Sequence, residues 1–430
     1  MKTKILVVLA AIALVFAFAF TACSNGSTGG GNQGDQTGTQ GQLAFERITS
    51  GENAGTWRVR KGTFKGGALV IPAYYNDSTG RAARGIEDGD PVTEIGASED
   101  DEWSAAFRDS GLTSVEIPDT VKLIGGYAFG WNQDITSITI PASVTKIWIG
   151  SFVHCDNLKS ITVAAGNPNY SNEGGILYTN IKEVFGRNVN EQYTDNNEKT
   201  VLHSYPSASG SVTIKEGVTQ INFYAIAYNK NITSVTIPDS VTFIDSNAFV
   251  ECYNLTNVTI GIGAFIDASA FVECSSLTSI TVDSGNPNFS SEGGILYTNL
   301  WEDEYGDTHY TDSKEHTILH SWPSASGSVT IKEGATCIGQ GAFAVNLNIT
   351  SVTIPLTVTK INAAAFIFCT NIKSITIPSN VTSMGNQVFL DWTSSQTINI
   401  EGYANQAAAD AAWGADWRAW CNAKINYNGS

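Results

Sequence analysis

Short stretches of alternating hydrophobic and polar residues recur along the chain at a nearly constant interval. Within the string Leu-Thr-Ser-Val-x-Ile-Pro, Val115 and Ile117 alternate with Ser114 and Glu116, the period of two expected for a strand with one buried face. Variants of this string begin at Leu112, Ile135, Leu158, Ile232, Leu255, Leu277, Ile349 and Ile372. Directly adjacent copies are 23 residues apart, or 22 in one case. The sequence therefore predicts one short strand in each repeat.

The rest of the repeat is too short to bury its own hydrophobic residues. A proline such as Pro118 ends the strand because it lacks a backbone donor, and a second aliphatic pair such as Val121 and Ile124 follows. A small residue and a phenylalanine come next, as in Ala128-Phe129. Because no stretch is long enough for a substantial helix, successive coils must stack into a solenoid. We predict one parallel sheet of short strands, with a continuous phenylalanine spine on the opposite side.

A longer period overlies the short one. Ile232 follows Leu112 by 120 residues, and Ile349 follows Ile232 by 117, so a block of coils occurs twice and begins a third time. Each complete block contains an insertion, at 164–206 and at 283–323. Matching Gly-Asn-Pro-Asn, Gly-Gly-Ile-Leu-Tyr and Leu-His-Ser motifs in these insertions predict a two-stranded, hairpin-like excursion.

Three residues after each phenylalanine position lies a column in which asparagine and cysteine alternate. Its members are Asn132, Cys155, Asn229, Cys252, Cys274, Asn346 and Cys369. Asparagine in a buried turn bonds to backbone groups, and a small buried thiol can occupy the same position. We therefore interpret these cysteines as structural. A disulfide between Cys252 and Cys274, on adjacent coils, stays geometrically possible.

The repeat resembles the BspA-like leucine-rich repeats of bacterial surface proteins. The resemblance rests on the Ile-Pro after the strand and on Ala-Phe-x-x-Cys/Asn-x-Asn-Leu before the next one, and it covers roughly Gly67 to Asn399. It implies a β-rich leucine-rich-repeat solenoid over 111–400. We expect residues 43–110 to form an N-terminal cap with an irregular first repeat.

Residues 401–430 are expected to form a C-terminal cap. Trp413, Trp417 and Trp420 are spaced by four and then three residues, which places them on one face of a helix covering the last coil.

The first residues have the pattern of a bacterial lipoprotein signal. Two lysines precede an apolar run from Ile5 to Phe20, and small residues then lead to Cys23. Phe20-Thr21-Ala22-Cys23 resembles a lipobox, which implies a signal peptide at 1–22 and lipidation of Cys23. The alternative is an ordinary cleaved signal with a nearby cysteine. Residues 23–42 are rich in Gly, Ser, Thr and Gln, which is typical of a flexible tether.

Charge and motifs narrow the function classes. Without the two lysines of the signal, 22 basic and 41 acidic residues leave a net charge of −19, which argues against nucleic-acid partners and against membrane contact other than through the lipid. No Gly-x-Ser-x-Gly, His-Glu-x-x-His or phosphate-binding glycine loop occurs. His203 and His320 are equivalent residues of the two insertions, and we interpret them as structural. We expect no cofactor, no bound metal and no catalytic residue, so the protein is not predicted to be an enzyme.

The outward positions of the predicted strands form a nearly uncharged lattice of hydroxyl groups. The candidate binding face comprises Ser137, Thr139, Ser160, Thr162, Ser234, Thr236, Thr259, Ser279, Thr281, Ser351 and Thr353. One interpretation is that threonine merely suits exposed strands. The other is recognition of an extended partner, because solenoids present long continuous surfaces.

These features predict a non-catalytic binding or adhesion protein of the bacterial envelope. It would be lipid-anchored in the outer membrane and exposed at the cell surface. The partner class implied by the resemblance is a protein of the host extracellular matrix or of another cell surface. A structural or assembly lipoprotein facing the periplasm is the alternative. An enzyme is a more remote one, and a deep pocket with convergent ionisable side chains would favour it.

Overall fold

The computed structural model describes residues 37–40, 42–75, 90–96, 106–182, 192–193, 198–302, 308–310 and 317–429. The chain divides into two compact units. The N-terminal unit consists of the chain up to Ser209 together with the separate segment Gly217–Asn231. The C-terminal unit contains Gly210–Glu216 and the chain from Ile232 onward. Each unit is a stack of coils with short parallel strands, which confirms the predicted solenoid.

The predicted signal peptide (1–22) and Cys23 lie outside the described residues. Within the expected tether (23–42), Thr37–Gln40 form β1, which pairs with β2 (Leu43–Arg47). Across the described part of the chain, no helix has the length and apolar character needed to cross a membrane.

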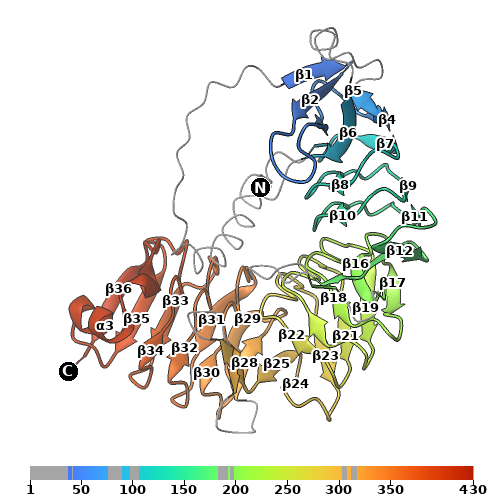
Figure 1. Cartoon of the computed structure of the whole chain (residues 1–430). Helices are drawn as coiled ribbons and strands as arrows, with labels where there is room; N and C mark the ends of the chain where they lie inside the picture. The colour runs from blue at the N-terminus through green and yellow to red at the C-terminus, as the bar shows by residue number, and fades with distance from the viewer. Residues whose placement is uncertain are drawn as a thin grey trace. The chain divides into compact units, whose positions relative to one another are not determined.

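The predicted strands form a first parallel ladder, with one strand from each coil (Figure 1). In the C-terminal unit, Val258 and Ile260 face the interior at 1% exposure, whereas Thr259 between them is exposed. The strands of this unit are β17 (Gly210–Thr213), β19 (Ile232–Ile237), β21 (Asn257–Ile260) and β23 (Ser279–Val282), then β29 (Gly327–Thr330), β31 (Ile349–Thr353), β33 (Ser374–Ile377), β35 (Thr397–Glu401) and β36 (Lys424–Asn428). The N-terminal unit contributes β4 (Gly67–Val70) with β7 (Leu112–Glu116), and β9 (Ser137–Ile140) with β11 (Ser160–Val163).

A second parallel ladder corrects the prediction of one parallel sheet. In most coils the second residue of the aliphatic pair, such as Ile124, forms a two-residue strand with the residue before it, and this strand pairs with its equivalent in the next coil. The strands are β8 (Leu123–Ile124), β10 (Lys146–Ile147), β16 (Val201–Ser204) and β18 (Gln220–Ile221) in the N-terminal unit, and β20 (Phe243–Ile244), β22 (Phe265–Ile266), β28 (Ile318–Ser321), β30 (Cys337–Ile338), β32 (Lys360–Ile361) and β34 (Ser383–Met384) in the C-terminal unit. Each strand buries a hydrophobic side chain, which is isoleucine in most strands, as at Ile124, and Leu202, Leu319 or Met384 in the others, because two ladders enclose the coil interior.

Stacked phenylalanine rings fill the side of each unit away from the first ladder, as predicted. Phe343 and Phe366 have ring centroids 5.2 Å apart and an interplanar angle of 6°. Phe249 and Phe271 stack at 5.3 Å. In the N-terminal unit, Phe129 stacks at 6.0 Å on the ring of the next coil. Every coil thus buries apolar surface that it could not cover alone, which is the main stabilising contribution in a solenoid.

The column of asparagine and cysteine residues satisfies the buried turns. Asn132 Oδ1 accepts hydrogen bonds from the amides of Ser110 and Leu112, and its Nδ2 donates to the Phe129 carbonyl at 2.7 Å. In other coils a thiol takes this place, as in Cys369, whose Sγ lies 3.0 Å from the Phe343 carbonyl. Burial raises the pKa of the Cys369 thiol to about 12, so it is not a thiolate at neutral pH. All six cysteines of the described residues are thiols, which supports the structural interpretation.

The two insertions form antiparallel hairpins, as predicted, with three strands rather than two. In the first, β12 (Tyr170–Glu173) pairs with β13 (Ile176–Thr179), which pairs in turn with β16. In the second, β24 (Phe289–Glu292) and β25 (Ile295–Thr298) pair in the same way with β28. Smaller hairpins follow, β14 (Ile181–Lys182) with β15 (Gln192–Tyr193) and β26 (Leu300–Glu302) with β27 (Thr308–Tyr310).

The N-terminal unit begins with antiparallel strands that precede the solenoid. β2 pairs with β3 (Trp57–Arg60), which then pairs in parallel with β6 (Asp90–Ile95), while β5 (Tyr74–Tyr75) borders β6. Arg58 bridges the transition, because its guanidinium contacts Glu94 at 2.6 Å with both side chains largely buried. Through β6, strand β3 therefore leads into the second ladder.

At the C-terminal end, the expected tryptophan face is only partly correct. Helix α3 (Gln406–Trp413) begins at the N-cap Asn405, and Gly414 ends it with a φ of 77°. Trp413 and Trp417 are buried, but Trp420 is 78% exposed, because the helical spacing does not extend past the glycine. The chain then returns to the first ladder as β36, so the end is one more coil with a helical connection.

Whereas the Phe271 turn places only Glu273 in the left-handed backbone region, the other fully described phenylalanine turns place two residues there. They lie two positions before and two positions after the ring, as Tyr127 (φ 53°) and Trp131 (φ 61°) do around Phe129. Such angles are uncommon for residues other than glycine and are most unfavourable for β-branched ones such as Val345 (φ 59°). The repeat pattern does not predict these two columns, because their side chains vary from coil to coil.

Candidate binding site at a shortened turn

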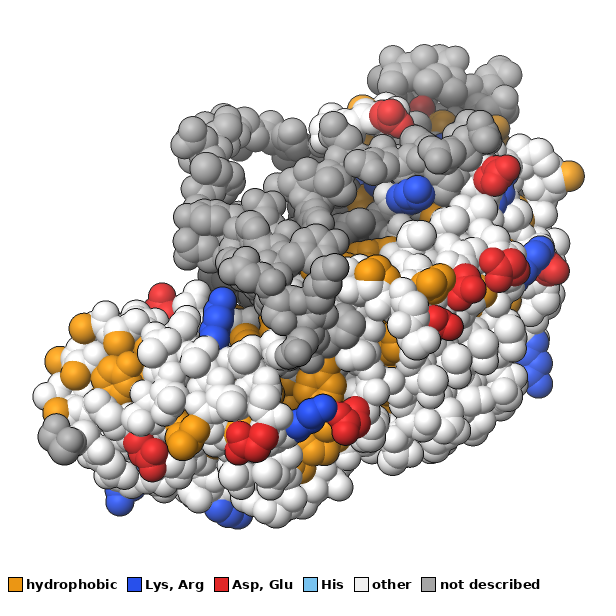
Figure 2. All heavy atoms as spheres, turned by 90° about the horizontal axis from the view of Figure 1, so that it is seen from below, with side chains coloured by type: hydrophobic (Ala, Val, Ile, Leu, Met, Phe, Trp, Pro, Cys, Tyr) orange, Lys and Arg blue, Asp and Glu red, His pale blue; other side chains and the backbone are white. Residues whose placement is uncertain are grey.

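The predicted candidate face lies on the outer side of the first ladder. All eleven hydroxyl residues are exposed or partly exposed, and Ser234 and Ser351 are the partly covered ones. The Ser351 hydroxyl donates to Ser328 on the preceding strand at 2.7 Å, and Ser234 donates to Ser211 at 2.8 Å. The view in Figure 2 likewise shows a surface that is mostly neither charged nor hydrophobic. This face can exchange hydrogen bonds but has little charge with which to attract an ion.

A second candidate site arises where each block shortens one turn. Leu319 pairs with Ile338 in the second ladder, and Gly327 pairs with Ile349 in the first. The chain therefore passes from the second ladder to the first in a step of eight residues in one coil, where the next coil takes a step of eleven. The same difference separates the coil of Leu202 from its successor. Tyr-Pro or Trp-Pro replaces the usual Ala-Phe at these turns. Since the neighbouring turns keep full length, each shortened turn leaves a notch.

A buried histidine anchors each shortened turn. The His203 Nε2–H donates to the Ile147 carbonyl at 3.0 Å, and Nδ1 accepts from the Ser204 hydroxyl. His320 makes the equivalent contact to the Ile266 carbonyl at 3.1 Å. Burial lowers the pKa of both imidazoles to about 4, so both are neutral at pH 7. These contacts support the structural interpretation of the two histidines.

In the N-terminal unit, aromatic rings fill the notch. Tyr228, from the coil after the shortened turn, lies 5.4 Å from Trp131 and 6.1 Å from His154. Tyr224 lies 5.9 Å from Tyr127. The Tyr127 ring passes over Gly150, where an added Cβ would come within 2.7 Å of it. Both Tyr224 and Tyr228 are less than 9% exposed, so they belong to the packed body of the unit.

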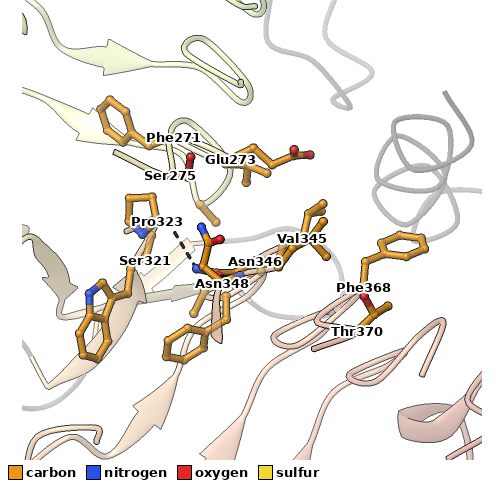
Figure 3. A pocket seen from close by; sticks show the side chains of 18 of the residues that line it. Phe271, Glu273, Ser275, Ser321, Pro323, Val345, Asn346, Asn348, Phe368 and Thr370 are labelled. Carbon is orange, nitrogen blue, oxygen red and sulfur yellow. Dashed lines mark hydrogen bonds between the residues drawn. The ribbon is translucent and has the colours of Figure 1, made fainter. Parts of the chain in front are cut away.

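In the C-terminal unit, the notch is an open pocket of about 750 Å³ (Figure 3). Phe271 and Glu273 come from the coil before the shortened turn, Pro323 comes from the turn itself, and Val345 comes from the coil after it. Trp322, Phe343 and Leu347 complete an apolar lining, and Leu347 is 50% exposed. A pocket of this volume is in the range that accepts a small ligand or a bulky side chain.

One wall of the pocket carries acidic side chains. The Tyr253 hydroxyl donates to Glu251 Oε2 at 2.7 Å and lies 3.2 Å from Glu273 Oε2. Burial, and then repulsion from Glu251, raises the pKa of Glu273 to about 8. Glu273 and Asp391 line the pocket, and no Lys or Arg is among the described residues that do. The wall can therefore bind a cation or donate a hydrogen bond from a neutral carboxyl group. Among all described residues, no cluster of three or more potential metal ligands occurs.

The difference between the two notches lies in a few aligned residues. When the two blocks are aligned, Tyr224 and Tyr228 of the N-terminal unit correspond to Gly341 and Val345 of the C-terminal unit. His154 corresponds to Glu273. The backbone is conserved, since Tyr224 and Gly341 have φ values of 58° and 60°. Sequence reasoning missed this pocket. A residue-by-residue comparison of the two blocks would have found the lost rings.

The stacked coils, the paired ladders and the asparagine–cysteine column define a leucine-rich-repeat protein. The family model described as "BspA type Leucine rich repeat region" matches six copies at residues 103–195, 204–293 and 324–411. Because these matches cover more than half of the chain, the protein belongs to this family.

Solved structures similar to this chain are also bacterial leucine-rich-repeat proteins. A leucine rich cell surface protein from Faecalibacterium prausnitzii A2-165 is 23% identical over 93% of this chain and 96% of that one, with a TM-score of 0.44. Leucine-rich repeat proteins from Eubacterium ventriosum ATCC 27560 (18%, 84% and 71%, TM-score 0.36) and Bacteroides ovatus ATCC 8483 (14%, 90% and 99%, TM-score 0.30) are also similar. The comparison with curated proteins found no match.

Proposed function

We propose that this protein is a non-catalytic protein-binding solenoid displayed on the bacterial envelope, with the hydroxyl face of the first ladder as its main contact surface. The observation that carries this proposal is the exposed, uncharged repetition of Ser and Thr along each unit. A flat face of this kind suits an extended polypeptide, which can exchange hydrogen bonds at each coil. Leucine-rich-repeat families are typically non-catalytic binding scaffolds, and no enzyme family matched the chain.

The partner class that we propose is a protein of the host matrix or of another cell surface, as the family resemblance implies. Lipidated Cys23 would hold the protein in the outer membrane, with the segment after it as the tether. A Cys23→Ser variant tests the anchor, because it should move the protein from the membrane fraction to the soluble fraction. Protease treatment of intact cells tests the orientation, since a surface-exposed solenoid is digested and a periplasmic one is retained.

The binding face is tested by placing charge on it. The whole protein is assayed against immobilised matrix proteins and neighbouring cells, alongside variants with Thr236→Lys and Thr259→Lys. Both threonines are exposed on the first ladder, so the fold should tolerate lysine while the contact surface is disrupted. Thr357→Lys, at an exposed turn position outside the ladder, is the matched control. Equal binding by all three variants and the parent would exclude the hydroxyl face as the contact surface.

A further inference from the structure

The open notch of the C-terminal unit differs from its equivalent in the N-terminal unit in the side chains that occupy it. The equivalent notch of the N-terminal unit is occupied by the rings of Tyr224 and Tyr228, which pack on three other ring-bearing side chains. In the C-terminal unit, the residues at these two positions are Gly341 and Val345, whose side chains are too small to occupy the same space. The backbone that supports those rings is present without them.

The lining has the composition that an aromatic ring requires. Trp322 and Leu347 offer accessible apolar surface, while Phe271, Phe343 and Val345 line the pocket as almost fully buried side chains. Aromatic rings gain most when they bury their faces against such side chains.

The acidic side chains of the lining favour a ligand that carries a positive charge. Glu273 and Asp391 border the pocket, with Tyr253 hydrogen bonded between Glu251 and Glu273. A cation next to Glu273 would favour its ionised form, which burial otherwise disfavours. Because the described lining contains no basic side chain, a ligand with a positive charge beside its ring is complementary to it.

We propose that this pocket receives an aromatic side chain of a partner polypeptide, with a neighbouring Lys or Arg side chain lying against Glu273. The proposal rests on the protein-binding function proposed above and adds a specific anchor to it. A single aromatic residue inserted into a desolvated pocket is the usual form of such an anchor at protein interfaces. The partner's extended segment would continue over the neighbouring turns, where Phe368 and Thr370 lie beyond Val345.

The test uses the whole protein and the acetylated, amidated tetrapeptide Gly-Arg-Tyr-Gly in an NMR titration. Matched peptides replace Tyr by Ala, or Arg by Glu. We expect loss of the ring to weaken binding roughly tenfold or more, and reversal of the charge to weaken it several-fold. Equal binding of the Ala peptide would overturn the aromatic anchor, and equal binding of the Glu peptide would overturn the role of Glu273. Free tyramine binding as tightly as the tetrapeptide would overturn a polypeptide as the source of the ring.

The matched variants restore the rings of the other unit. Gly341→Tyr with Val345→Tyr should refill the notch and abolish peptide binding, since both positions already have the backbone angles of their tyrosine equivalents. A Cβ at Gly341 would meet only ordinary contact, with Ala344 Cβ at 3.7 Å. Val345→Tyr alone serves if the double variant fails to fold. Glu273→Gln should remove the preference for Arg over Glu peptides, and Thr357→Tyr, at an exposed turn position outside both the pocket and the hydroxyl face, should leave peptide binding unchanged.

The peptide experiments can contradict the pocket proposal without contradicting the proposed function, and the reverse also holds. If the refilled variant still binds the peptide like the parent, the pocket proposal is wrong even when matrix or cell binding persists. If peptide binding follows the pocket variants but no matrix protein or cell is bound, the hydroxyl face and its partner class are wrong while the pocket stands.

Discussion

The notches of the N-terminal and C-terminal units share their backbone and differ in what occupies them. Both follow a hairpin insertion, both contain a turn three residues shorter than its neighbours, and a buried histidine anchors each. In one, Tyr224 and Tyr228 close the surface with stacked rings. In the other, Gly341 and Val345 leave a pocket of about 750 Å³.

Comparison of the two units distinguishes the residues that every coil needs from the positions at which the side chain can vary. Inward isoleucines, the spine and the column of asparagine and cysteine are retained in both units, because each supports the neighbouring coil. The left-handed positions keep their backbone conformation while their side chains vary from coil to coil, even where, as at Tyr228 and Val345, those side chains are buried. Val345 illustrates this freedom, since it stays at a left-handed φ of 59° that costs roughly 1–2 kcal/mol for a residue with a side chain.

The largest expected effect is that of opening the closed notch. Tyr224→Gly combined with Tyr228→Val should lower the free energy of unfolding by about 3–5 kcal/mol, because it removes two buried rings and their contacts with Tyr127, Trp131 and His154. Denaturant unfolding monitored by tryptophan fluorescence measures the change. The reverse exchange in the C-terminal unit, Gly341→Tyr with Val345→Tyr, should cost less, about 1–2 kcal/mol, because its main penalty is a side chain at the left-handed φ of Gly341. Similar costs for the two exchanges would contradict the distinction between a packed and an open notch.

His203 and His320 should have the same effect on the pH dependence of stability, because both are buried and make the same backbone contact in their notches. His203 and His320 have pKa values of about 4 in the folded state, against about 6.5 in the unfolded chain. Between these values the unfolded state binds protons that the folded state does not, so stability is complete above pH 6.5 and is lost as the pH falls toward 4. Each histidine should contribute a loss of up to roughly 3 kcal/mol at pH 4.

Substitution by glutamine isolates this contribution. Unfolding of the parent, His203→Gln and His320→Gln proteins is compared at pH 7 and pH 4.5, and each variant should show a smaller pH dependence than the parent. Carboxyl groups that also titrate in this range are present in all three proteins, so their contribution cancels in the difference between variant and parent. An unchanged pH dependence in either variant would mean that its imidazole is not held neutral by burial.

The acidic wall should make the open notch sensitive to alkaline pH. The pKa of Glu273 is raised from 4.5 to about 8, so the stability it contributes is complete below pH 4.5 and is lost as the pH rises through 8. Glu273→Gln should therefore be more stable than the parent by at least about 1 kcal/mol at pH 9, with no such gain at pH 4. Glu401→Gln, at an exposed strand end, is the control. A gain that is equal at both pH values would exclude ionisation of Glu273 as its cause.

Much of the coil follows directly from the sequence, because its signals are local and repeated. Val258 and Ile260 alternate with polar residues, and Phe249 recurs at the coil spacing, so the first ladder and the spine were predictable. The second ladder was not, since a two-residue strand has too short a pattern to recognise. The exposure of Trp420 was mispredicted because the helix ends at Gly414, between Trp413 and Trp417, so the helical spacing does not continue to Trp420.

The pocket could be predicted only in part. The Trp322-Pro323 pair departs from the Ala-Phe pattern and marks the shortened turn, and alignment of the blocks pairs Tyr228 with Val345. Neither fact indicates that a ring at position 228 would reach Trp131, which lies 97 residues earlier in the chain. That contact depends on how the intervening coils stack, and it decides whether the notch is filled.

The smallest expected effects concern the hydroxyl face, where the two units should not differ at all. Thr139→Ala in the N-terminal unit and Thr259→Ala in the C-terminal unit each remove an exposed side chain from the first ladder, so each should change the free energy of unfolding by no more than about 0.5 kcal/mol. Phe271→Ala, in the spine two positions from Glu273, should cost about 3–5 kcal/mol in the same assay. If either threonine proved as costly as the phenylalanine, the assignment of inner and outer strand faces would be reversed, and the hydroxyl face could not be the surface offered to a partner.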